Sequence, residues 1–168
     1  MNSILCTALL LFASQAGTPA TQQAPPIVEA KAKWTPLAPD YSQETLDSMG
    51  RIAFEAVKAI HPTKLASLKF RFVELSEMES VLVAEILPQM RIQFEDEETA
   101  AFNTETFARA MAAGVIAKFA TKAGEVLVVR QNIFDLAELI DLKELACVEV
   151  LQAVLCHEAV HAVDNHAH

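Results

Sequence analysis

The sequence has few cysteines and few positive charges. It holds 3 cysteines among 168 residues, which is too few for a scaffold built on disulfides. Lysine and arginine total 13 against 22 aspartate and glutamate residues, so the formal net charge is -9, and no basic stripe is visible. Because binding to a phosphate backbone needs clustered positive side chains, this balance argues against a nucleic-acid partner. With 52% hydrophobic and 21% charged residues, the composition is typical of one globular domain.

Two of the cysteines, Cys147 and Cys156, lie in the C-terminal part of the chain, whereas Cys6 lies in an apolar N-terminal run. If both lie on one helix, their separation corresponds to about 13 Å of axial rise. That distance is too long for a disulfide. We therefore expect two free, buried thiols.

The apolar run Ile4–Ala13 has the length of the hydrophobic region of a signal peptide and is too short to span a bilayer. Ser14 and Ala16 are small residues that suit signal-peptidase cleavage after Ala16. No Lys or Arg precedes the run, which leaves a buried N-terminal helix as the alternative. We predict residues 1–16 as a signal peptide. The chain is then exported, periplasmic or extracellular, with no integral membrane span after cleavage.

A proline-rich stretch follows the apolar run. Five of the seven prolines lie between Gly17 and Pro39. Such a composition favours extended, poorly packed chain, so residues 17–41 are predicted as a linker ahead of a domain over 42–168. A tether and a plain disordered N-terminus are both compatible with it.

The first half of the domain predicted over 42–168 is expected to form a helix, a strand and a second helix. Apolar residues at helical spacing after an N-cap at Ser42 predict a helix that stops at His61-Pro62. Alternation over residues 68–75 predicts a strand with one buried face. A capping-box pattern that begins at Ser76 then predicts a short helix that ends at Pro88.

The second half of the body mixes the same two kinds of element. The acidic run 95–98 lacks the ligand and glycine spacing of a calcium loop and is predicted as a solvated turn. An apolar ridge predicts a helix over 104–120, and β-branched residues predict a strand over 125–130. Patterns that resemble a helix capping box predict a short turn over 135–140 and a long helix from about residue 142. The expected fold class is α+β.

One motif carries recognisable chemistry. Residues 145–163 are apolar on most sides, which is typical of a central helix covered by other elements. This stretch contains His-Glu-Ala-Val-His, and on a helix His157 and His161 lie one turn apart on one face, where both can bind one zinc ion. Glu158 lies beside the first histidine. Zinc lowers the pKa of a bound water, whose proton such a carboxylate can accept and pass to a leaving amine.

These five residues match the HExxH signature of the zincin metallopeptidases. The strand predicted over 125–130, followed by a long buried helix, resembles the order of edge strand and active-site helix in that family. The resemblance implies a zincin-like subdomain and a zinc cofactor held by His157 and His161. It also implies Glu158 as the general base and a peptide or protein substrate that pairs with the edge strand. Outside the motif the resemblance is architectural only.

The third protein ligand of a catalytic zinc is not secured by the motif. Zincins with a glycine turn use HExxHxxGxxH, whereas this chain has Asp164 and Ala167 at the glycine and third-histidine positions. His166 or His168 can reach the metal only if the chain turns near Asp164-Asn165. Alternatively, the Asp164 carboxylate can accept a hydrogen bond from the ring N–H of a ligand histidine that faces away from the metal.

Three accounts of the chain remain open at this point. The first is an exported gluzincin-like metallopeptidase of which these residues form an N-terminal portion, with the third ligand farther along. The second is a secreted non-catalytic protein that binds zinc through His157, His161 and a terminal histidine. The third is a secreted helical interaction module with an accidental motif. Cys156 precedes the first histidine but points about 100° away from it on a helix, and is expected in the core.

Overall fold

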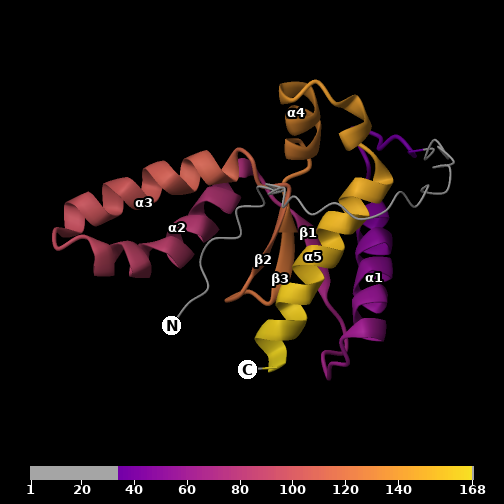
Figure 1. Cartoon of the computed structure of the whole chain (residues 1–168), viewed down its shortest axis with the longest axis horizontal. Coiled ribbons are helices and arrows are strands. Elements are labelled where there is room, and N and C mark those ends of the chain that lie inside the picture. Colours follow the sequence, from indigo (N-terminus) through magenta and orange to yellow (C-terminus); the bar gives the residue numbers. More distant parts are fainter. Residues whose placement is uncertain (1–33, 168) are drawn as a thin grey trace, which may run out of the picture. The chain divides into compact units, whose positions relative to one another are not determined.

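The computed structural model describes residues 34–167 of the chain, and their fold is α+β, as predicted. The predicted signal peptide, the linker as far as residue 33 and His168 lie outside the described residues. Helices surround a small sheet (Figure 1). In chain order the elements are α1 (Gln43–Ile60), β1 (Lys69–Phe72), α2 (Leu75–Gln93), α3 (Glu97–Ala112), β2 (Ala117–Ala120), β3 (Glu125–Val128), α4 (Asn132–Leu139), the 3₁₀ turn η1 (Lys143–Leu145) and α5 (Val148–Ala167).

The sheet has three strands in the order β1-β3-β2. β1 runs parallel to β3, with Lys69 opposite Glu125, and β2 runs antiparallel to β3, with Ala117 opposite Val128. The strand predicted over 125–130 therefore exists, but its expected place at the edge is wrong, because β3 is the central strand and β2 is an edge. The place of a strand depends on partners distant in the chain, which local spacing does not reveal.

Successive residues of β3 point to opposite faces of the sheet, and each face carries its own core. Val126 and Val128 belong to the cluster that includes α1 and α5, whereas Leu127 belongs to the cluster that includes α2 and α3. Figure 1 shows α1 and α5 side by side on one face. The second cluster consists of Val73, Met78, Leu82, Ala108, Ala112, Ala120, Leu127 and Val129.

The helix expected after Ser42 is confirmed at both ends. The Ser42 hydroxyl accepts a hydrogen bond of 3.2 Å from the backbone N–H of Thr45, and α1 ends at Ile60 with His61 as its C-cap, ahead of Pro62. One face of α1 packs on β1, where Gly50 lies directly against the ring of Phe70. A side chain larger than hydrogen does not fit at that contact.

The capping box predicted at Ser76 and the stop predicted at Pro88 are both wrong. α2 begins at Leu75, after Glu74, so Ser76 lies inside the helix and its carbonyl accepts a hydrogen bond from the Ser80 hydroxyl. α2 then continues past Pro88 to Gln93. A proline removes one helical hydrogen bond, and α2 continues through it while packing against α3.

The acidic run, predicted as a turn, contains the start of α3. The Asp96 carboxylate accepts a hydrogen bond of 2.7 Å from the backbone N–H of Thr99, which is the geometry of an N-cap. Glu97 and Glu98 form the first turn, where negative side chains complement the positive end of the helix dipole. The run thus has a structural role in starting a helix.

The helix predicted over 104–120 is wrong in its second half. α3 stops at Ala112, and Ala117–Ala120 form β2. The buried side chain of Asn132 donates hydrogen bonds of 2.7 Å to the carbonyls of Ala112 and Val115, which lie where the helix ends. These carbonyls are therefore satisfied by a residue from α4, a long-range contact that the apolar ridge does not encode.

The predicted turn over 135–140 and helix from about residue 142 are misplaced. Asp135 and Glu138 lie within α4, and the long helix begins only at Val148. Between them Asp141 has a left-handed backbone, with a φ of 53°, which breaks the helical path. The backbone N–H of Val148 donates to the carbonyl of Thr35, so a distant segment fixes the start of α5.

Residues 34–41, assigned to the linker by composition, pack on the domain. Leu37 and Tyr41 are buried in the core cluster of α1 and α5. Pro36 forms an isolated bridge with Cys147, and the Thr35 hydroxyl donates to Glu149 at 2.8 Å. The packed domain therefore begins before the boundary predicted at residue 42.

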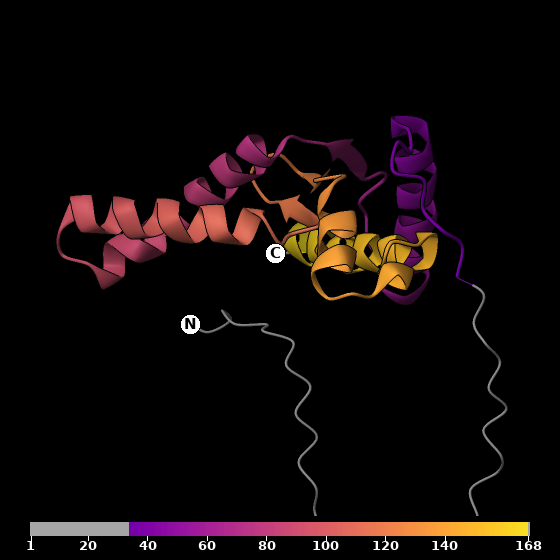
Figure 2. The same cartoon turned by 90° about the horizontal axis from the view of Figure 1, so that it is seen from above.

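α2 and α3 form a hairpin that extends beyond the sheet (Figure 2). An ion pair of 2.8 Å between Lys118 of β2 and Glu85 of α2 joins the hairpin to the edge strand. Within residues 34–167, no helix combines the length and the apolar character needed to cross a bilayer.

Candidate metal centre

The HExxH residues lie on α5, which is less enclosed than predicted. Its inner face is buried and includes Leu151, Leu155, Ala159 and Ala162. His157 and His161 lie on the outer face, and the side chain of His157 is 64% exposed. The expectation of a helix covered on most sides is thus wrong, because the described chain leaves the histidine face in solvent.

The two histidines converge on one another. Their Nε2 atoms are 3.1 Å apart, with ring centroids 4.6 Å apart and ring planes at 88°. Two nitrogens bound to one tetrahedral zinc at ~2.0–2.1 Å are about 3.3 Å apart, so the pair already has nearly that spacing. The same distance also suits one imidazole donating a hydrogen bond to the other. Either way, both imidazoles present Nε2 to a shared point.

Glu158 has a different environment from its neighbours. Its residue exposure is 8%, and Oε2 accepts a hydrogen bond of 2.7 Å from the backbone N–H of Phe119 in β2. The other oxygen, Oε1, is 4.0 Å from Nε2 of His157. One oxygen is therefore anchored to the sheet while the other lies nearer the histidine pair.

The anchor lies on the free edge of β2. The N–H of Val129 donates to the carbonyl of Ile116, which directs the backbone groups of Ile116 toward β3. Because direction alternates along an antiparallel strand, Ala117 and Phe119 direct theirs outward. The Glu158 carboxylate therefore binds the Phe119 N–H, which lies on the edge where an added strand would pair.

The opposite sheet edge is covered in a similar way. The Gln43 side chain of α1 donates to the carbonyl of Phe70 at 2.8 Å and accepts from the N–H of Phe72 at 3.2 Å. At each edge of the sheet, one helix side chain thus binds polar backbone groups: Gln43 at β1 and Glu158 at β2. The difference is that Gln43 binds a donor and an acceptor of β1, whereas Glu158 binds a donor only.

The structure does not bring a third ligand to the histidine pair. Among residues 34–167, no group of three or more His, Cys, Asp and Glu side chains is arranged to hold a metal ion. α5 continues through Asp164 and Asn165 to Ala167, so the turn required for His166 is absent. His166 lines a separate small cavity with Pro62, Thr63 and Lys64.

Cys156 is not part of the pair either. Its thiol lies 3.8 Å from the carbonyl of Ala53, packed beside the core cluster, and burial raises the pKa of the thiol. Both cysteines are free, as predicted, but only Cys147 is fully buried, whereas Cys156 is partly exposed. A raised pKa disfavours the thiolate that a metal would bind.

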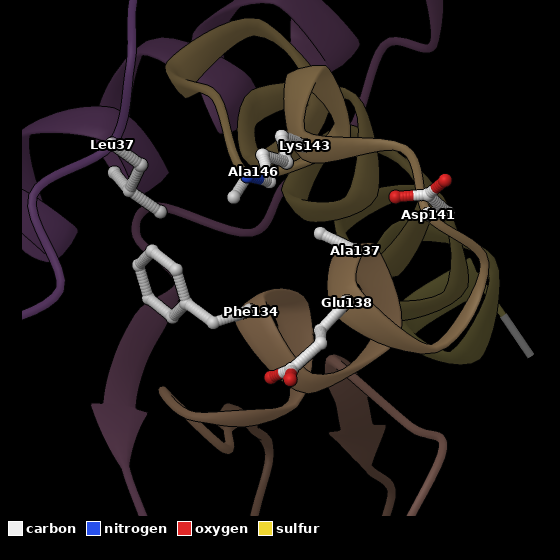
Figure 3. Close-up of a pocket in the computed structure, with 7 residues that line it drawn as sticks. All are labelled: Leu37, Phe134, Ala137, Glu138, Asp141, Lys143 and Ala146. Atoms are coloured by element: carbon white, nitrogen blue, oxygen red, sulfur yellow. The ribbon is translucent and has the colours of Figure 1, made fainter.

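Two hollows on the described surface lie away from the histidines. One, of about 500 Å³, lies between the N-terminal segment and the α4–η1 region (Figure 3). No residue of α5 lines it, and its polar side chains are Glu138, Asp141 and Lys143. The histidine pair therefore stands on an open surface, next to the edge strand.

The HExxH motif placed His157, Glu158 and His161 on one helix, α5, but did not reveal the contact that fixes Glu158. The partner of Glu158 is a backbone N–H, which carries no side-chain signature. Only the pairing of β2 with β3, which turns the Phe119 N–H outward, identifies it.

Comparisons with known proteins add no family to this description. No protein-family model, no curated protein and no solved structure matches the chain.

Proposed function

We propose that this chain is an exported zinc-dependent metallopeptidase of the zincin type. The observation that carries the proposal is the 3.1 Å approach of Nε2 of His157 to Nε2 of His161 on an exposed helix face. A pair of neutral imidazoles at this spacing offers two corners of a zinc site. The adjacent carboxylate of Glu158 supplies the group that such chemistry needs as a base.

His157 and His161 would hold the metal, and a third protein ligand would come from outside residues 34–167. When bound, zinc supplies Lewis acidity toward a carbonyl and toward water. Glu158 accepts a proton at Oε1, the oxygen nearer His157, and keeps its position through Oε2 on the Phe119 N–H. Because the hydrogen bond to Oε2 restrains the side chain, Oε1 keeps its position near His157.

The substrate in this proposal is an extended peptide beside β2. Ala117 and the carbonyl of Phe119 provide outward backbone groups, so a peptide can add as a further strand at this edge. The edge is adjacent to Glu158, because the carboxylate binds one of its N–H groups. A peptide bond held there lies near the base and the histidine pair.

A second candidate function is a secreted protein that binds zinc without catalysis or acts as a helical interaction module. It is favoured by the exposed position of His157 and by the lack of a third ligand within residues 34–167. A solvent-exposed histidine pair suits metal binding better than control of a reacting substrate.

Zinc content of the purified chain after dialysis tests the metal site. We expect close to one zinc per chain, lost in the His157→Ala/His161→Ala double variant and kept in His61→Ala, which removes another exposed histidine. A chain that takes up no zinc, or takes it up equally in the double variant, contradicts the proposal.

Hydrolysis of an unstructured protein such as casein separates the two candidate functions. A peptidase is inhibited by 1,10-phenanthroline and loses activity in Glu158→Gln while retaining zinc, because the amide cannot take a proton. Zinc binding without hydrolysis favours the non-catalytic protein. Mass measurement of the secreted chain tests export, since cleavage is expected after Ala16.

A further inference from the structure

A second surface hollow lies where the parallel strands β1 and β3 end. β1 leads into α2 and β3 leads into α4, so the two connections lie side by side at one end of the sheet. The crevice beyond the carboxyl ends of parallel strands is a common ligand site. Here it holds a cavity of about 600 Å³, lined by both connections and by the segment that precedes α1.

Arg130 is the only basic side chain lining this cavity, and its Nε–H is buried without a hydrogen-bond partner among the described residues. Its guanidinium lies 4.2 Å from the centre of the Phe72 ring and 5.6 Å from that of Tyr41. No carboxylate within residues 34–167 forms an ion pair with it, in contrast to Arg71, which binds two. Leaving a buried donor unpaired costs free energy, and an acceptor on a ligand would remove that cost.

Three carboxylates line the same cavity. Asp40 and Glu74 form no ion pair with the described residues, and Asp135 accepts a hydrogen bond from the Gln131 side chain. A purely anionic ligand would be repelled by these groups. A purely cationic ligand would leave the Arg130 Nε–H unsatisfied. A ligand that carries both charges can pair with both kinds of group.

The remaining lining favours an apolar substituent. Phe72, Leu75 and Val129 provide hydrocarbon surface, and the volume is within the range of small-molecule sites. The first turns of α2 and α4 begin at the cavity, and their positive dipole ends favour a carboxylate beside Arg130.

We infer that this cavity binds a zwitterionic ligand of the amino-acid class. Its carboxylate lies on the Arg130 guanidinium, its ammonium on the carboxylates of Asp40 and Glu74, and its apolar side chain on the hydrocarbon lining. No residue of α5 takes part, so the site does not depend on the histidine pair or on a metal.

Titration calorimetry of the full chain with L-leucine tests the inference. Two analogues each lack one charge: 3-methylbutylamine has no carboxylate and 4-methylpentanoate has no ammonium. Both should bind at least about tenfold more weakly than leucine, because each leaves one set of polar groups unpaired. No heat of binding with leucine, or equal affinity for 4-methylpentanoate, overturns the inference.

Variants locate the binding to the cavity. Arg130→Gln should abolish leucine binding, whereas Arg51→Gln, which changes an exposed arginine on α1, should leave it unchanged. Asp40→Asn serves as the second variant, because Asp40 is exposed and its change does not threaten folding. It should weaken leucine binding, because the ligand ammonium loses a carboxylate partner, and should strengthen the weak binding of 4-methylpentanoate, because one repelling charge is removed. Unaltered leucine affinity in both Arg130→Gln and Asp40→Asn rules the site out.

Discussion

The backbone N–H of Phe119 in β2 donates a 2.7 Å hydrogen bond to the carboxylate of Glu158 in α5. The two residues belong to the edge strand and to the helix that carries the histidine pair. This one contact therefore fixes the spacing between a candidate substrate-binding edge and a candidate base. It also satisfies a strand donor that would otherwise face outward without a partner.

Removing the acceptor should destabilise the domain. Glu158→Ala leaves the Phe119 N–H unpaired in a buried position, which costs about 1–3 kcal/mol in free energy of unfolding. Glu158→Gln keeps an amide oxygen as acceptor and should cost less. Urea denaturation measures both, with Glu105→Ala, an exposed position on α3, as the control. Equal stability of Glu158→Ala and the wild type would show that the contact does not hold the edge.

Acid should weaken an ion-pair network across β1 and β3. Hydrogen bonds from Arg71 hold the pKa of Glu125 below its ordinary value of 4.5, so the folded state prefers the ionised carboxylate. The stability from this preference is fully present above the ordinary pKa and is lost as the pH falls through the lowered one. The difference in unfolding free energy between wild type and Glu125→Gln should therefore be largest near neutral pH and shrink in acid. A difference independent of pH contradicts this.

Close contact between α1 and β1 should make one glycine irreplaceable. A methyl group at Gly50 would overlap the ring of Phe70, so Gly50→Ala should lower the free energy of unfolding by about 1–3 kcal/mol. Gly114 is the matched control, because its nearest neighbour would be the Met111 carbonyl oxygen at 3.9 Å. Gly114→Ala should leave stability unchanged or raise it by up to about 1 kcal/mol. Thermal denaturation of the two variants and the wild type measures these changes in stability.

The features that the sequence predicted correctly are local ones. The N-cap at Ser42 and the stop before Pro62 follow from side chains within a few residues of each helix end. The β-branched residues of 125–128 likewise favour a strand wherever it pairs. The HExxH spacing placed His157 and His161 on one helix face for the same reason.

Several of the failures involve partners from elsewhere in the chain. Phe119 continued a helical ridge in the sequence, yet it lies in β2 because β3 pairs with it and Asn132 binds the carbonyls where α3 ends. Pro88 remained inside α2 because α3 packs along that helix. The environment of Glu158 belongs to this second group, so the motif alone did not predict a carboxylate anchored to the sheet.

Titration of Tyr41 tests the packing of residues 34–41, the segment that composition had assigned to a linker. Burial raises the pKa of Tyr41 to about 12 from 10.0, against a smaller opposing effect of the nearby Arg130 charge. Tyr41 is the only tyrosine in the chain, so the ultraviolet absorbance of tyrosinate reports on it alone. Its raised pKa favours the neutral phenol in the folded state, so the associated stability is complete below about pH 10 and is lost as the pH rises toward the folded pKa. We expect a midpoint of about 12 in the folded chain, returning to 10.0 in denaturant. A folded-state midpoint equal to the denatured one would mean that the ring is solvated and that the segment does not pack on the core.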